Sequence, residues 1–179
     1  MNNFKFANPV KIIFGKNTIQ ELSKEIPTES KVMLIYGGGS ILKNGVYDQV
    51  AAALKNFRWI EFAGIEANPH YETCVKAIEK IRENKVDFLL AAGGGSVVDA
   101  VKFIAAGAAI HQDPWDIMTG KAAISKALPF GTVITLPATG SEMNSNFVIT
   151  KNETKEKLAA GSFHIFPKFS ILDPETTYS

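Results

Sequence analysis

Short runs of apolar residues alternate along the chain with longer segments in which apolar residues recur at helical spacing. The runs at 32–36, 58–62, 86–92 and 132–136 have the length of strands that are buried on both faces. Between them, apolar residues recur every three or four positions, as they do across 71–84. This alternation predicts an α/β fold with a parallel sheet flanked by helices, in which ligands bind at the carboxyl ends of the strands.

The pattern differs near the two ends of the chain. Residues 4–14 are partly alternating, and Pro9 suits an edge strand because proline cannot donate to a central ladder. Thr18 and Glu21 have the spacing of a helix capping box. Three short segments toward the other end predict further strands, at 147–150, 157–160 and 169–172.

Two of the predicted strands end in the same four residues, Gly-Gly-Gly-Ser, at 37–40 and at 93–96, and a helical pattern follows each. Glycines lack the Cβ atoms that would keep a ligand away from the backbone, and the first N–H groups of a helix have no partner inside it. Such a turn can therefore bind a phosphate group. A tight turn with Ser96 as N-cap explains one motif equally well, whereas two motifs in one chain favour a nucleotide site.

Charged and hydroxyl side chains lie near the second glycine turn. Asp99 stands one helical turn after Ser96, so its carboxylate either faces a ligand or interacts with the helix N-terminus, and both interpretations stay open. Lys102 predicts a surface ion pair with Asp99, worth about 0.3 kcal/mol. Thr139 and Ser141 place two hydroxyl groups after the strand at 132–136.

Composition narrows the classes of function. A chain of 179 residues, 46% of them hydrophobic and 21% charged, predicts one globular domain over 1–179. With a net charge of +1, we expect neither a nucleic-acid partner nor a membrane partner. Cys74 is the one cysteine, which fits a reducing compartment, and no signal-peptide pattern or membrane-length apolar run occurs. A cytoplasmic protein is expected.

No catalytic or metal-ligating residue is predicted in the chain. His70, His111 and His164 lie in separate segments without the short spacing of metal-ligand pairs, and we interpret them as surface or capping residues. Cys74 lies in a helical pattern, which favours burial over reactivity. No Gly-x-Ser-x-Gly nucleophile turn is present.

Several motifs resemble those of the iron-containing, or group III, alcohol dehydrogenase family, and the similarity extends over the whole chain. They are a Phe-x-x-Pro-x-x-Ile-x-Phe-Gly pattern at 6–15, AGGGSVVDAVK at 92–102, LPATGSE at 136–142 and Leu-Asp-Pro at 172–174. YGGGS at 36–40 is most similar to the branch of NADPH-dependent butanol dehydrogenases and broad-range aldehyde reductases. The resemblance implies a Rossmann-like N-terminal domain, followed in the family by an all-helical domain with the dinucleotide between the two.

The resemblance also implies a cofactor site. Its residues would be Gly37, Gly38, Ser40, Asn68, Gly94, Gly95, Ser96, Asp99, Thr139, Ser141 and Lys157. NAD-preferring relatives tend to carry an aspartate where this chain has Gly38, because a carboxylate accepts hydrogen bonds from the ribose 2′-hydroxyl and repels a 2′-phosphate. NADP is therefore the expected cofactor.

By this resemblance the chain is the NADP(H)-binding domain of a homodimeric, metal-dependent enzyme that interconverts small primary alcohols and aldehydes. The family's ligands for divalent iron or zinc would lie beyond residue 179, so we expect the chain alone to be inactive and to hold no metal. Two alternatives stay open: a stand-alone nucleotide-binding module without catalysis, and a relative of dehydroquinate synthase or glycerol-phosphate dehydrogenase. The LPATGSE segment speaks against the second alternative.

Overall fold

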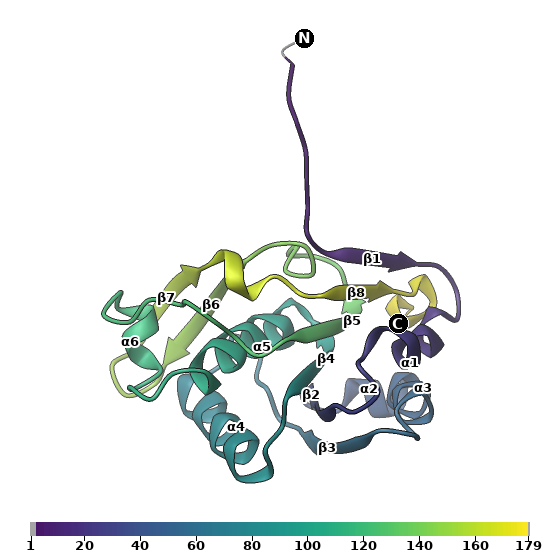
Figure 1. Ribbon diagram of the computed structural model, residues 1–179, viewed down its shortest axis with the longest axis horizontal. Coiled ribbons are helices and arrows are strands. Elements are labelled where there is room, and N and C mark those ends of the chain that lie inside the picture. Colours follow the sequence, from purple (N-terminus) through teal and green to yellow (C-terminus); the bar gives the residue numbers. More distant parts are fainter. Residues whose placement is uncertain (1–2, 179) are drawn as a thin grey trace.

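A six-stranded parallel sheet forms the centre of the molecule, in the order β1-β8-β5-β4-β2-β3 (Figure 1). The computed structural model describes residues 3–178, so residues 1, 2 and 179 of the predicted domain lie outside the described part. The strands of this sheet are β1 (Lys11–Phe14), β2 (Lys31–Tyr36), β3 (Arg58–Phe62), β4 (Phe88–Gly94), β5 (Phe130–Leu136) and β8 (Phe169–Leu172). The predicted α/β fold with a parallel sheet is confirmed.

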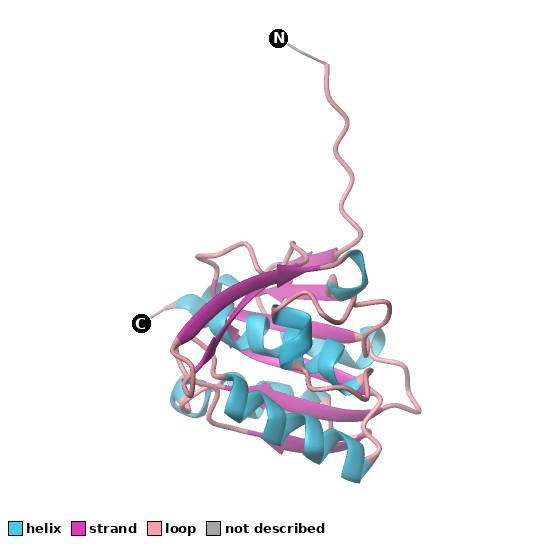
Figure 2. Cartoon of the chain, turned by 90° about the vertical axis from the view of Figure 1, so that its left-hand side faces the viewer, coloured by secondary structure: helices cyan, strands magenta, loops and turns pink. Residues whose placement is uncertain are grey.

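Helices cover both faces of this sheet (Figure 2). One face carries η1 (Thr18–Glu21), α1 (Leu22–Glu25), α2 (Ser40–Lys43) and α3 (Val46–Ala53), and the other carries α4 (Tyr71–Asn84), α5 (Gly95–Ala108) and α6 (Trp115–Met118). In β2, Val32 and Leu34 pack with the first group, whereas Met33 and Ile35 pack with the second. Because successive strand residues point to opposite faces and both faces are buried, the strand reads as a continuous apolar run.

A separate antiparallel hairpin lies on the outer side of α5. Its strands are β6 (Asn146–Lys151) and β7 (Glu156–Gly161), which confirms the short strands predicted there. Phe147 of β6 packs against Phe103 of α5 with 5.9 Å between ring centroids. The hairpin and the sheet therefore bury α5 between them, and its residues from Val97 to Gly107 are buried except for Asp99.

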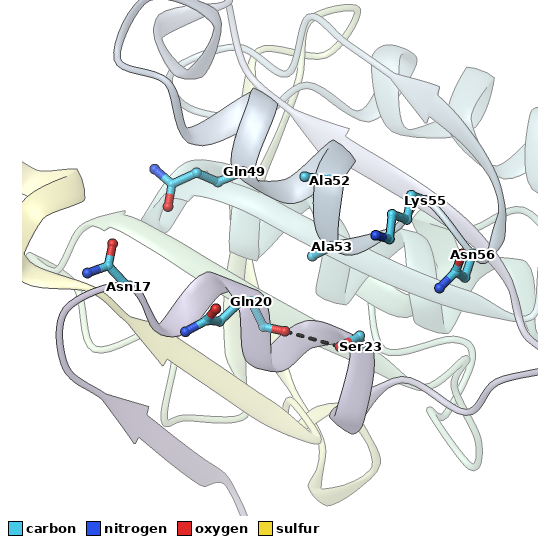
Figure 3. Close-up of a pocket in the computed structure, with 8 residues that line it drawn as sticks. All are labelled: Asn17, Gln20, Ser23, Gln49, Ala52, Ala53, Lys55 and Asn56. Atoms are coloured by element: carbon cyan, nitrogen blue, oxygen red, sulfur yellow. Dashed lines mark hydrogen bonds between the residues drawn. The ribbon is translucent and has the colours of Figure 1, made fainter.

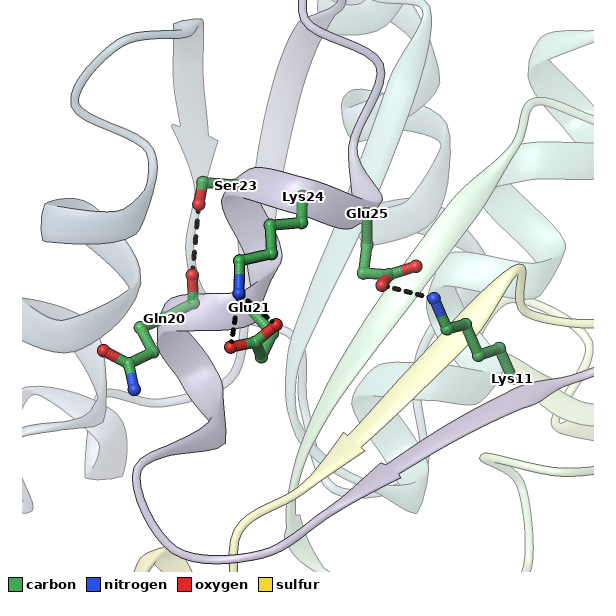
Figure 4. Close-up of polar contacts among 6 residues, drawn as sticks. All are labelled: Lys11, Gln20, Glu21, Ser23, Lys24 and Glu25. Carbon is green, nitrogen blue, oxygen red and sulfur yellow. Dashed lines mark hydrogen bonds and ion pairs between the residues drawn. The ribbon is translucent and has the colours of Figure 1, made fainter.

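The first segment of the chain forms the edge of the sheet. Of the predicted extended stretch, β1 joins the ladder and pairs with β8, which confirms its edge position. An ion pair between Lys11 of β1 and Glu25 of α1 ties this edge to the helical layer (Figure 4). Residues 3–7 are exposed and run away from the body of the molecule, whereas the Asn8 side chain donates to the Met143 carbonyl oxygen at 2.8 Å (Figure 1).

One local prediction is wrong. The hydroxyl of Thr18 donates to the Gly15 carbonyl oxygen at 2.8 Å, and the cap of η1 makes no side-chain hydrogen bond, so there is no capping box. The helical pattern predicted after the first glycine turn is confirmed by α3. The short helix α2 precedes it, and the two are separated at Gly45, whose φ of 77° lies in the left-handed region that glycine tolerates.

Across residues 3–178, no helix combines the length and the apolar character that a membrane span needs.

Candidate functional site

The register of the sheet places the two glycine turns side by side. β2 and β4 are neighbours, and Tyr36 lies opposite Ala92, so the turns leave the same edge at adjacent strands. A Cβ atom on Gly37 would lie 3.6 Å from Cγ2 of Val97, and one on Gly93 would lie 2.7 Å from the same atom. From this edge the chain continues toward β3 after β2 and toward β5 after β4. Ligands of parallel sheets bind where the connections diverge in this way.

The second turn leads directly into α5, which begins at Gly95. Gly94 is the cap residue and no side chain bonds to the helix end, so the prediction that Ser96 is the N-cap is wrong. The first N–H groups of a helix have no partners within it, and the helix dipole adds partial positive charge there. This end of α5 can accept an anionic group.

A cavity of about 220 Å³ lies at the start of α5. Its lining residues come from α5, the loop after β3, the loop after β5, and the β6–β7 hairpin; they are Asn68, Pro69, Gly95, Ser96, Asp99, Thr139, Val148 and Lys157. Six of the predicted cofactor residues therefore meet in one place. A second cavity, of about 240 Å³, shares Asp99, Thr139 and Val148 with the first.

Lys157 and Asn68 form one rim of the first cavity. The Lys157 ammonium group donates to Oδ1 of Asn68 at 2.8 Å, which joins the hairpin to the loop after β3. Asn68 has a φ of 59°, and both side chains are exposed. A lysine ammonium has three donors, so Lys157 can also reach an anion in the cavity.

Asp99 points out of its helix toward the neighbouring segments. Its Oδ1 accepts a hydrogen bond from the Ser141 hydroxyl at 2.6 Å, and its Oδ2 accepts from the Val148 N–H at 3.1 Å. Burial raises the pKa of the Asp99 carboxyl above its usual value, against the effect of these two bonds and of Lys102. Asp99 lines both cavities. The geometry therefore favours a carboxylate that faces a ligand over one that only interacts with the helix N-terminus.

Lys102 does not form the predicted surface ion pair. Its side chain is fully buried, and its ammonium group donates to Oγ of Ser141 at 2.8 Å, Oδ1 of Asn144 at 2.9 Å and the Asn146 carbonyl oxygen at 2.9 Å. Burial lowers the pKa of Lys102 to about 8, against the charges of Asp99 and Glu142. The sequence interpretation missed this network, although two asparagines shortly after the LPATGSE segment are a signal that could have indicated it.

The Ser141 hydroxyl is turned inward. It donates to Asp99 and accepts from Lys102, and the residue is 2% exposed. Its hydroxyl hydrogen is engaged by Asp99, and Ser141 lines the second cavity and not the first. Thr139, in contrast, is exposed and lines both cavities.

The remaining predicted residues lie outside both cavities. They are Gly37, Gly38, Ser40 and Gly94. A Cβ atom on Gly37 would lie 3.2 Å from the Ile65 carbonyl oxygen, so a side chain there would crowd the loop after β3. Gly38 is exposed and has open space where a Cβ atom would be, so a larger side chain at this position would project into solvent or against a ligand.

Metal-ligating side chains are dispersed over the part of the chain that the structure describes. No group of three or more His, Cys, Asp or Glu residues within 3–178 stands close enough to hold a metal ion. His70 contacts Asn152, with 3.0 Å between Nδ1 and Nδ2. Burial raises the pKa of the Cys74 thiol far above its ordinary value, which makes this cysteine unreactive.

A larger cleft lies away from the glycine turns. It measures about 390 Å³ and runs between η1, α1 and α3 (Figure 3). Its lining is made of small and amide side chains with one lysine, listed here in full: Asn17, Gln20, Ser23, Gln49, Ala52, Ala53, Lys55 and Asn56. Size alone does not make it the functional site, because it holds none of the residues that the motifs indicate.

Comparison with known proteins gives consistent matches. The family model of iron-containing alcohol dehydrogenases matches residues 9–174. The NADPH-dependent aldehyde reductase YqhD of Escherichia coli (strain K12) is 51% identical over 182 residues, which cover 100% of this chain and 47% of that protein. The probable NADH-dependent butanol dehydrogenase 2 of Bacillus subtilis (strain 168) is 52% identical with the same coverage.

Solved structures agree with the sequence matches. The crystal structure of YqhD from E. coli K-12 superposes with a TM-score of 0.94 at 50% identity, over 99% of this chain and 46% of that chain. The structure of the NADH-dependent butanol dehydrogenase A from Thermotoga maritima also gives a TM-score of 0.94, at 48% identity and the same coverage. The chain thus spans about half the length of the relatives that it matches.

Proposed function

Because the chain belongs to the iron-containing alcohol dehydrogenase family, we propose that it is the NADP(H)-binding domain of an enzyme that interconverts small primary alcohols and aldehydes. The observation that carries the proposal is the cavity at the start of α5, where Gly95, Ser96, Asp99, Thr139 and Lys157 come together. Family membership also weighs against a dehydroquinate synthase or a glycerol-phosphate dehydrogenase, because the relatives are named as aldehyde reductases and alcohol dehydrogenases.

The residues of the cavity suit a dinucleotide. The backbone at Gly95 and Ser96 offers the N–H groups of a helix end to the pyrophosphate, and the Lys157 ammonium group adds positive charge on the opposite rim. The hydroxyl of Thr139 can donate between them. When bound, NADPH supplies a hydride to an aldehyde, and the role of these side chains is to bind the cofactor and to orient it.

The metal that the family's description names does not fit the residues described here. Within 3–178 no set of three ligating side chains is available, so no step of the reaction is assigned to a metal ion held by these residues. The alcohol dehydrogenase activity is proposed for the whole enzyme. For this chain we propose cofactor binding.

The choice between NADP and NAD is proposed from Gly38, because the relatives include both NADPH- and NADH-dependent enzymes by name. We expect the chain to bind NADPH more tightly than NADH. The Gly38→Asp substitution would place a carboxylate in open space at the first glycine turn and weaken NADPH relative to NADH by roughly 1–3 kcal/mol, through repulsion of the 2′-phosphate.

Titration of both cofactors against both proteins measures this change. Gly38→Asn is the matched control, because it adds nearly the same volume without the charge, and it should alter the preference much less. A preference of the unmodified chain for NADH would contradict the choice of cofactor, whereas binding of neither cofactor would contradict the proposed function itself.

We also propose that the chain forms a homodimer through its N-terminal segment. Among residues 3–178, β1 pairs with β8 alone, and Phe4 and Phe6 of the adjoining segment are 84% and 76% exposed. An unpaired strand edge beside two exposed aromatic rings is suited to pairing with a second copy.

Sedimentation equilibrium tests the dimer. We expect the double substitution Phe4→Ser and Phe6→Ser to weaken dimerisation at least about tenfold, since each ring loses on the order of 1.5–3 kcal/mol of burial. Phe163→Ser, at a ring that is 76% exposed elsewhere on the surface, serves as control. A typical dissociation constant for a dimer is about micromolar. If the unmodified chain is still monomeric at a concentration about 100 times higher, the dimer is ruled out.

A further inference from the structure

We infer that Lys102 is a positioning residue, whose buried ammonium group holds the loop between β5 and β6 in the conformation that forms one wall of the cofactor cavity. This inference rests on the proposed function of that cavity. Lys102 itself lines neither cavity, so it acts through the residues it contacts and not on a ligand.

The three acceptors of Lys102 lie at the middle and at the end of this loop. They are Ser141 Oγ, Asn144 Oδ1 and the Asn146 carbonyl oxygen, 39 to 44 residues away along the chain. Asn144 Oδ1 also accepts from the Asn146 N–H at 2.9 Å, which folds the loop back on itself before β6 begins. One ammonium group therefore fastens the connection from β5 to β6 at three points.

Two side chains of the cavity wall depend on this fastening. The Ser141 N–H donates to Oγ1 of Thr139 at 3.3 Å, and the Ser141 hydroxyl donates to Asp99 at 2.6 Å. Because the hydroxyl accepts from Lys102, its hydrogen is directed toward Asp99. Lys102 thereby orients Asp99 and Thr139, both of which line the cavity.

Packing alone does not account for a lysine at this position. A fully buried ammonium group is costly to desolvate, and replacement of a whole buried ionic cluster by apolar side chains is often neutral or stabilising. The lowered pKa of Lys102 has this desolvation as its first cause, and the charged groups that act against it are Asp99 on α5 and Glu142 in the loop. The geometry that this lysine imposes on the loop is the property that a methionine could not supply.

The Lys102→Met substitution removes the donor and keeps most of the side-chain volume. We expect NADPH to bind about tenfold more weakly at a temperature where circular dichroism shows the variant folded, and the unfolding temperature to fall, because three acceptors in the loop lose their donor. Lys102→Gln keeps two of the donors and should recover part of the affinity. Lys80→Met on α4 is the control, because the Lys80 ammonium group donates to a single carbonyl oxygen, that of Glu61, and lines neither cavity.

The dependence of NADPH affinity on pH gives a second test, because a side chain that only stabilises the fold would not make this affinity change with pH. An ammonium group has three hydrogens for the three acceptors, whereas the neutral amine has two. As pH rises from about 7 to about 9, across the pKa of about 8, NADPH affinity should fall in the unmodified chain and stay level in Lys102→Met.

Hydrogen exchange of the loop completes the test. In Lys102→Met, amides of residues 138–146 should exchange about tenfold faster, with α5 unchanged. Tight NADPH binding by Lys102→Met together with unchanged exchange in the loop would overturn the inference. If the unmodified chain binds neither NADPH nor NADH, the proposed function fails, and the amide exchange of residues 138–146 still decides whether Lys102 holds the loop.

Discussion

Gly95→Val is expected to abolish measurable binding of NADPH, a loss of at least about 100-fold in affinity, which corresponds to roughly 3 kcal/mol. Gly95 is the first residue of α5 and lies against the loop after β5. A Cβ atom at this position would lie 2.3 Å from Oγ1 and 2.7 Å from Cγ2 of Thr139. The valine would therefore displace Thr139 or the start of the helix, and both of these line the cavity.

The structure changes the reason for this expectation. From the sequence, a side chain at Gly95 is expected to occupy space that the pyrophosphate needs, whereas the missing Cβ atom points at Thr139. The double substitution Gly95→Ala with Thr139→Gly distinguishes the two causes, because it removes the contact while it leaves a methyl group at position 95. Recovery of affinity relative to Gly95→Ala alone would identify the packing against Thr139 as the cause.

Isothermal titration with NADPH measures the effect, and circular dichroism shows whether the variant is folded. Ala108→Val, at the other end of α5, adds two methyl groups to the same helix away from the cavity and should bind normally. A folded Gly95→Val variant that binds NADPH as the unmodified chain does would show that the second glycine turn is only a structural connection.

Phe103→Ala is expected to lower the free energy of unfolding by about 3–5 kcal/mol, a large part of the stability of a domain of this size. Phe103 is fully buried on α5. Its ring centroid lies 6.2 Å from that of Tyr71 on α4 and 5.9 Å from that of Phe147 on β6. The substitution would open a cavity where three elements meet, and rigid close-packed neighbours fill such a cavity poorly.

Urea denaturation followed by tryptophan fluorescence measures this loss. Phe163→Ala is the matched control, because that ring is 76% exposed, and its substitution should change the free energy of unfolding by no more than about 0.5–1 kcal/mol. A Phe103→Ala variant with less than about 1 kcal/mol of destabilisation would mean that α5 and the hairpin are not packed together as described.

Local sequence patterns were sufficient for the elements of the main sheet. Apolar runs of strand length became β2, β3, β4 and β5, and both glycine motifs lie at the ends of neighbouring strands, at the same edge of the sheet. These features are local, because a strand buried on both faces must be apolar at every position and a turn close to another chain segment needs glycine. The family motifs likewise predicted six residues that the structure brings to one cavity, although their role in cofactor binding stays a prediction.

Contacts between distant segments required the tertiary structure. Helical spacing placed Lys102 beside Asp99 as a surface pair, yet its partners are Ser141, Asn144 and Asn146, at least 39 residues away. The covering of α5 by the β6–β7 hairpin likewise depends on the packing of Phe147 against Phe103. Periodicity indicates which side of an element is apolar, but it does not indicate which other element covers that side. The amino-acid order therefore determined the strands and turns. Packing between distant segments decided which charged groups became buried and which side chains face the cavity.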